Sequence, residues 1–169
     1  MNQAHLHLLL NHLPILGALF GLLILAGGFF LKNEPVKRTA LGLFVFSAIL
    51  AIPAYLTGEG AEEVVENLPG ASENLMEAHE EMANIFLWMV GALGLISLVT
   101  LYTDLKSKKV APMLYTLTFV AAIGTMVLAQ RVGSSGGEIR HTEIRSGATT
   151  AGIENGQTGG QENSDDEDD

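Results

Sequence analysis

The five histidines are the side chains of this sequence best suited to chemistry, because the chain contains no cysteine. A neutral imidazole can bind a haem iron or a transition-metal ion, and it can take up a proton near neutral pH. The histidines precede, open or follow long apolar stretches of the chain: His5, His7, His12, His79 and His141. They are therefore grouped around the ends of the apolar stretches.

The residues before the third apolar stretch predict a helix that begins well ahead of it. Ser72 followed by Glu73, after a Pro-Gly turn, is typical of a helix start. One face of this helix carries residues at spacings of four, three and four: Leu75, His79, Met82 and Phe86. Glutamates fill most of the remaining surface. His79 is therefore expected to point into a helix bundle while its acidic neighbours face water.

His12 is expected at a similar depth on the first apolar helix, because the proline two residues later suits a first helical turn. We therefore predict that His12 and His79 are the two axial ligands of a haem iron. His7 and His141 are expected to form a second pair or to support the first, and Arg140 to contact a haem propionate. The same four histidines could instead hold a transition-metal ion, or order the helix ends by hydrogen bonding alone.

Two catalytic motifs are only partly present in this sequence. The string HEEMA starts like the zinc-protease motif H-E-x-x-H, but Ala83 stands where the second histidine is needed. A carboxylate-bridged di-iron site needs Glu-x-x-His pairs, and Met76 occupies the position three residues before His79. The apolar stretches contain no charged residue, which disfavours an ion pump or a proton-coupled transporter. An enzyme is therefore the least favoured class of function.

Four stretches are long enough to carry these side chains across a bilayer as helices. About 20 apolar residues span the hydrocarbon core, and only helices satisfy their own backbone groups there. The stretches cover residues 13–31, 39–57, 83–103 and 110–130. The chain is 48% hydrophobic with a mean hydropathy of +0.31 and only 17% charged residues. We therefore expect an all-α integral membrane four-helix bundle formed by residues 1–145, with a Gly17-Gly21 pair that allows close helix packing.

The positions of lysine and arginine predict how this bundle is oriented. Basic residues concentrate in short cytoplasmic loops. Six of the nine lie in residues 32–38 and 106–109, whereas residues 58–82 contain none and include eight glutamates. The two basic loops are therefore expected in the cytoplasm. The acidic loop, both termini and all five histidines are then expected on the outer side of the membrane.

Residues 146–169 consist mostly of Gly, Ser, Thr, amides and acids and end in SDDEDD, which predicts a disordered acidic tail. A net charge of −10, with only nine Lys plus Arg among 169 residues, argues against a nucleic-acid partner. The expected partners are the lipid bilayer and a redox protein or membrane complex.

Short strings in the sequence resemble a bacterial membrane-protein family known as domain of unknown function 2231. The string HLLLNHLPILGALFG resembles the family's H-P-x-x-V-H-F-P-I opening at His7, His12, Pro14 and Ile15. It departs from that opening at Leu8, Asn11 and Leu13. HEEMAN fits the family's histidine near the start of the third helix, and GGEIRHTEIR resembles the tail of a bacterial branch. The resemblance covers about residues 5–145 and implies a four-helix inner-membrane bundle without a settled activity.

These observations predict a small inner-membrane protein that binds haem b or a transition-metal ion for electron transfer or redox sensing. The alternative, from a different class, is a structural or assembly subunit of a membrane complex that carries no cofactor of its own.

Overall fold

The computed structural model of the chain describes residues 2–145, and most of these residues are α-helical. The elements in chain order are α1 (Gln3–Leu10), α2 (His12–Phe30), α3 (Glu34–Leu56), α4 (Gly58–Val65), α5 (Glu73–Leu105), α6 (Ala111–Arg140) and the short 3-10 helix η1 (Thr142–Ile144). No strand occurs within this part of the chain, which confirms the expected all-α fold. The predicted acidic tail, residues 146–169, lies outside the described residues.

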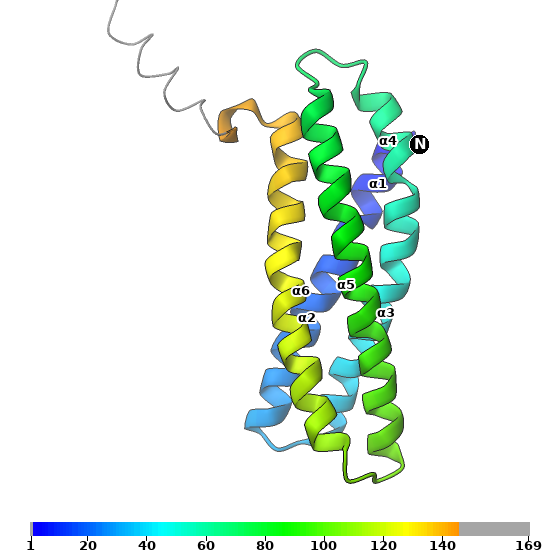
Figure 1. The fold of residues 1–169 in the computed structure, drawn as a ribbon, viewed down its shortest axis with the longest axis vertical. Helices are drawn as coiled ribbons and strands as arrows, with labels where there is room; N and C mark the ends of the chain where they lie inside the picture. Colours follow the sequence, from blue (N-terminus) through cyan, green and yellow to red (C-terminus); the bar gives the residue numbers. More distant parts are fainter. Residues whose placement is uncertain (1, 146–169) are drawn as a thin grey trace, which may run out of the picture.

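The four long helices form an up-and-down bundle (Figure 1). α2 packs on α3, α3 on α5 and α5 on α6, and α6 closes the ring against α2 over a smaller contact. The two short helices α1 and α4 lie side by side at one end of the bundle. α1 leads into α2 at Asn11, and α4 follows α3 directly after Thr57. Pro14, three residues after Asn11, cannot donate a backbone hydrogen bond, which explains why the first helix is interrupted here.

Small residues allow α2 and α3 to pack closely. A Cβ atom added to Gly21 would lie 2.6 Å from the ring of Phe44, and one added to Gly17 would collide with the Ser47 side chain. The G-x-x-x-G pair therefore packs against another helix of the same chain. Gly94 has the same role on α5, where an added Cβ would lie 2.5 Å from the Ala48 side chain.

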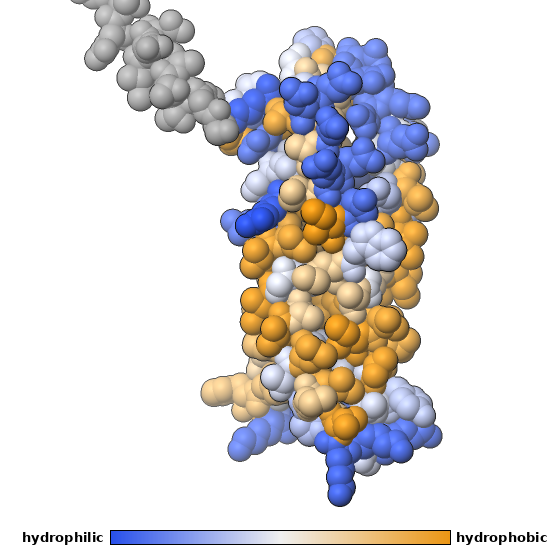
Figure 2. Space-filling model, in the orientation of Figure 1, coloured by the Kyte–Doolittle hydropathy of each residue, from blue (hydrophilic) through white to orange (hydrophobic). Residues whose placement is uncertain are grey.

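A belt of apolar side chains surrounds the bundle. Leu23, Trp88 and Val120 are 58%, 76% and 60% exposed, although each lies within a long helix. Figure 2 shows this belt as an orange band between two blue ends. Four helical segments are long and apolar enough to cross a membrane: Gln3–Phe30, Glu34–Val65, Glu73–Leu105 and Ala111–Arg140. Such a wide exposed apolar surface is typical of a protein embedded in lipid.

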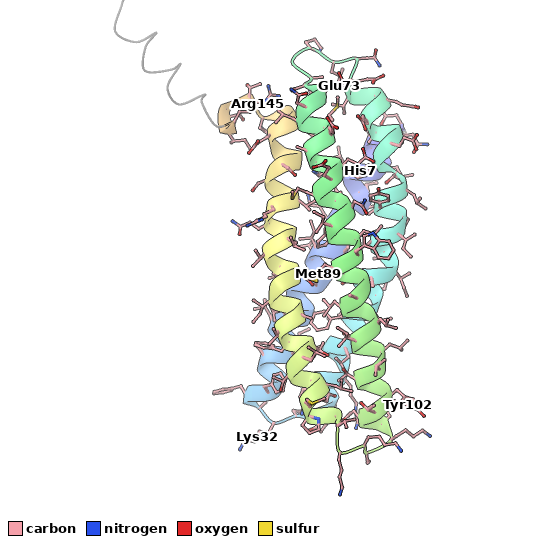
Figure 3. All side chains as sticks on the ribbon, in the orientation of Figure 1. His7, Lys32, Glu73, Met89, Tyr102 and Arg145 are labelled. Carbon is pink, nitrogen blue, oxygen red and sulfur yellow. The ribbon has the colours of Figure 1, made fainter. Side chains whose placement is uncertain are left out.

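The two ends of the bundle differ in their chemistry. Figure 3 labels His7, Glu73 and Arg145 at one end and Lys32 and Tyr102 at the other. We name the first the histidine end; it consists of α1, α4, the first turns of α5 and the last turns of α6. We name the other the lysine end; it consists of the α2–α3 and α5–α6 loops and the helix turns beside them.

Candidate functional site

The histidine end brings together side chains that are distant in the sequence. His5 and His7 lie on α1, His12 is the first residue of α2, and His79 lies in the second turn of α5. His141 follows the last residue of α6. The predicted early start of the third long helix is confirmed, since α5 begins at Glu73 after Ser72. This extension carries His79 beyond the apolar part of the helix.

The His7 ring is half-buried and hydrogen-bonds to the end of α3. Its Nδ1 atom lies 3.0 Å from the carbonyl oxygen of Ala54 and 3.2 Å from the Thr57 hydroxyl. The Thr57 hydroxyl donates to the carbonyls of Pro53 and Ala54, at 3.0 and 2.9 Å. Both neighbours of Nδ1 therefore act as acceptors. Since a carbonyl oxygen can only accept, Nδ1 of His7 carries the proton and donates it.

The His79 ring is also half-buried and reaches across to α6. Its Nδ1 atom lies 3.0 Å from the Ser135 hydroxyl, which itself donates to the carbonyl of Val132 at 3.0 Å. Because the serine hydroxyl donates to this carbonyl, we infer that His79 donates from Nδ1 and Ser135 accepts. Gly136 makes room for the ring, since an added Cβ would lie 2.9 Å from the Cε1 atom of His79.

The two half-buried rings therefore share one tautomer. In each, Nδ1 donates a proton and Nε2 keeps an unprotonated lone pair. Within residues 2–145, neither Nε2 atom forms a hydrogen bond. Both rings lie at the histidine end of the bundle, His7 on α1 and His79 on α5. A histidine that binds a metal usually donates its other N–H to a carbonyl or a similar acceptor, and His7 and His79 are both anchored in that way.

The other predicted site residues lie nearer the surface. His12 is exposed, and its Nδ1 atom is bonded to the carbonyl of Leu8, one turn back along the chain, at 3.0 Å. His141 is exposed and pairs with Glu143 at 2.9 Å, and Arg140 is exposed at the end of α6. The pKa of Glu143 is held below its usual value by a backbone hydrogen bond and by His141. Of the histidines predicted to bind a cofactor, His7 and His79 are therefore half-buried, whereas His12 and His141 are exposed.

The number of protein ligands at the histidine end limits which metal-containing group it could hold. Within residues 2–145, no group of three or more His, Asp or Glu side chains is arranged to hold a metal ion. A transition-metal ion bound by protein alone usually takes three or four ligands. A haem iron already has four porphyrin nitrogens and needs only one or two ligands from the protein. Two imidazoles therefore fit haem better than a bare ion.

The sequence analysis missed the partners that orient the two rings. Ser135 lies beyond residue 130, where the fourth apolar stretch was expected to end, but α6 continues to Arg140. Ala54 contributes only a backbone carbonyl, which no side-chain pattern reveals. The one available signal was the GSSGG string, whose small side chains allow a ring on another helix to approach.

Comparison of the chain with protein-family models, with curated proteins and with solved structures finds no match.

Proposed function

We propose that this protein binds haem b at its histidine end, where His7 and His79 would hold the iron, and that it serves electron transfer or redox sensing. The observation that carries the proposal is that the Nδ1 atom of each half-buried ring is anchored, whereas neither Nε2 atom has a hydrogen-bond partner within residues 2–145. Haem iron supplies one-electron chemistry when bound. The protein supplies two oriented imidazoles at the edge of an apolar bundle, where a porphyrin ring is soluble and its propionates can reach water.

The location of the site follows from the distribution of charge. We propose that the lysine end faces the cytoplasm of a bacterium, because six of the nine basic residues lie in its two loops. The histidine end and both termini are then periplasmic. The expected partner is a redox protein or a membrane complex that docks on the periplasmic face. This assignment agrees with the resemblance to domain of unknown function 2231, which we also retain as a proposal.

A second candidate function is a structural or assembly subunit of a membrane complex. The observation that favours it is that both rings already join helices: His7 joins α1 to the end of α3, and His79 joins α5 to α6. In this case the histidines stabilise the end of the bundle and bind no cofactor.

Asparagine variants separate these two functions. The amide N–H of asparagine lies near the position of Nδ1 of histidine, so His7→Asn and His79→Asn can keep the bonds to Ala54 and Ser135. Asparagine has no atom at the position of Nε2 and cannot replace the iron ligand. We expect the purified wild type to show a Soret band with sharp α and β bands on reduction. Each of the two asparagine variants should lose most of this absorbance at unchanged membrane abundance.

The exposed histidines provide the controls for this experiment. His5→Asn and His12→Asn should keep the haem content of the wild type. A colourless wild type, without metal by elemental analysis, would exclude the haem proposal. The structural function would then be supported if alanine at His7 or His79 lowered abundance and asparagine restored it.

A further inference from the structure

An open groove lies between α5 and α6 at the histidine end, and neither His7 nor His79 lines it. It has a volume of about 490 Å³. Its lining includes one residue of α5 and several of α6: Met82, then Val127, Arg131, Ser134 and Glu138. The four residues of α6 recur at spacings of four, three and four, so they share one face of the helix.

The chemistry of the groove changes in order along α6. Val127 lies in the apolar part of the helix and is 50% exposed, and Arg131 follows one turn later, directly after the apolar stretch 110–130. Glu138 lies seven residues beyond Arg131, which is about 10 Å along the helix axis. From the apolar belt outward, the groove therefore presents an apolar surface, then a cation and then a carboxylate.

Neither charged group of the groove is neutralised by the protein. Within residues 2–145 the Arg131 guanidinium and the Glu138 carboxylate form no salt bridge, either with each other or with another residue. Arg131 is exposed and Glu138 is half-buried, and both line the groove. Arg131 has no acidic partner although eight glutamates lie in residues 58–82 at the same end. Each group can therefore pair with an opposite charge on a ligand.

We propose that this groove binds a phosphatidylethanolamine lipid from the membrane leaflet at the histidine end. The Arg131 guanidinium donates hydrogen bonds to the lipid phosphate, and the primary ammonium of the lipid donates to the Glu138 carboxylate. One acyl chain lies along Val127 and Met82. The proposal rests on the membrane location proposed above and does not depend on the haem.

The order of groups in this lipid matches the order along the groove. In a bilayer, the acyl chains, the phosphate and the ammonium of phosphatidylethanolamine follow one another toward the water. The trimethylated ammonium of phosphatidylcholine has no N–H to donate to Glu138. Phosphatidylglycerol would leave Glu138 without a cation and bring a further negative charge to an end rich in glutamate. A membrane lipid is favoured over a soluble phosphate compound because the groove continues into the apolar belt.

Native mass spectrometry of the detergent-purified full chain tests this proposal. The protein is mixed with equal amounts of phosphatidylethanolamine, phosphatidylcholine and phosphatidylglycerol that carry the same acyl chains. We expect the wild type to retain the ethanolamine lipid in about fivefold excess over phosphatidylcholine, the effect of one partly exposed ion pair. Phosphatidylglycerol should also be retained less than the ethanolamine lipid.

Two substitutions separate the roles of the charged groups. Arg131→Gln should lower the retention of all three lipids several-fold, because each has a phosphate. Glu138→Gln should leave the retention of phosphatidylcholine unchanged and remove the preference for the ethanolamine lipid. Neither substitution removes a salt bridge within residues 2–145, so the melting temperatures without added lipid should stay at the wild-type value.

Arg140→Gln and Glu77→Gln are the matched controls, since both residues are exposed at the same end and neither lines the groove. They should keep the wild-type ratios. Equal retention of the three lipids by the wild type, or unchanged retention in Arg131→Gln, would overturn the proposal. A preference for phosphatidylglycerol would overturn the role of Glu138. Displacement of the bound lipid by soluble phosphoethanolamine would overturn the assignment to a membrane lipid.

Discussion

The two nitrogens of a histidine are not equivalent, and the partner of one determines what the other can do. Nδ1 of His7 donates to a backbone carbonyl at 3.0 Å, and Nδ1 of His79 donates to Ser135 at the same distance. Each ring is therefore held in place before any ligand arrives. A ligand set that is already oriented loses less conformational entropy on binding, which favours affinity.

At the residue scale we predict that Gly136→Ala displaces the His79 ring. The new Cβ would lie 2.9 Å from Cε1 of His79. The ring would have to move away from Ser135, so haem content should fall several-fold and the free energy of unfolding by about 1–2 kcal/mol. Absorbance per protein and thermal melting in detergent measure the two effects.

Gly133→Ala is the control for this prediction. It lies on the same helix, and no atom lies within 4 Å of the position of its added Cβ. It should leave haem content unchanged and stabilise α6 slightly, because alanine is the better helix former. Equal changes in haem content and stability for the two substitutions would mean that the close approach of Gly136 to His79 does not position the His79 ring.

At the scale of helices, the glycines of α2 determine how closely α3 can approach. We predict that Gly21→Ala destabilises the bundle by about 1–3 kcal/mol, because the added methyl group would lie 2.6 Å from the ring of Phe44. Gly27→Ala is the control on the same helix, because no atom lies within 4 Å of its added Cβ. This substitution should not lower the stability of the bundle. Thermal aggregation of the two variants in detergent compares them, and similar melting temperatures would contradict this account of the α2–α3 contact.

The segment after α6 is tied to the loop that precedes α5. The Arg145 guanidinium donates to the carbonyls of Glu138 and Ile139, at 2.8 and 2.9 Å, and to that of Gly70 at 3.1 Å. We predict that Arg145→Ala increases proteolysis of the 66–72 loop by a few-fold, because these charge-assisted bonds are partly exposed and each contributes modestly. Arg140→Ala is the control, since Arg140 is an exposed arginine at the end of α6. Cleavage at equal rates in both variants would show that Arg145 does not hold the loop.

At the scale of the whole molecule, the two ends of the bundle carry opposite excess charge. The α4–α5 region contains eight glutamates and no basic residue, whereas six of the nine basic residues lie in the two loops of the lysine end. We predict that a reporter active only in the periplasm is active when fused after Asp169 and inactive when fused at Asn33. The reverse pattern would place the histidine end in the cytoplasm and would require a cytoplasmic redox partner.

The all-α class and the four apolar helices follow from the amino-acid sequence, because the length and apolar character of a spanning helix are local properties of the chain. The early start of α5 at Glu73 was also predicted from local residues, although the Ser72 side chain forms no capping hydrogen bond. Only the tertiary structure decided that His7 is half-buried and that His12 is exposed. Both residues flank the same apolar stretch, and the interruption of the helix at Asn11 turns α1 toward α4.

The partners of the candidate sites also depended on tertiary structure. Ser135 is 56 positions from His79 and Ala54 is 47 positions from His7, and sequence periodicity carries no information across such separations. Lys37 and Arg38 were recognised only as topology signals. Their contacts with Tyr115 and Asp104 arise because four helix ends converge at the lysine end. Periodicity reveals which face of a helix is buried, but the pairing of helices in space decides which side chains meet there.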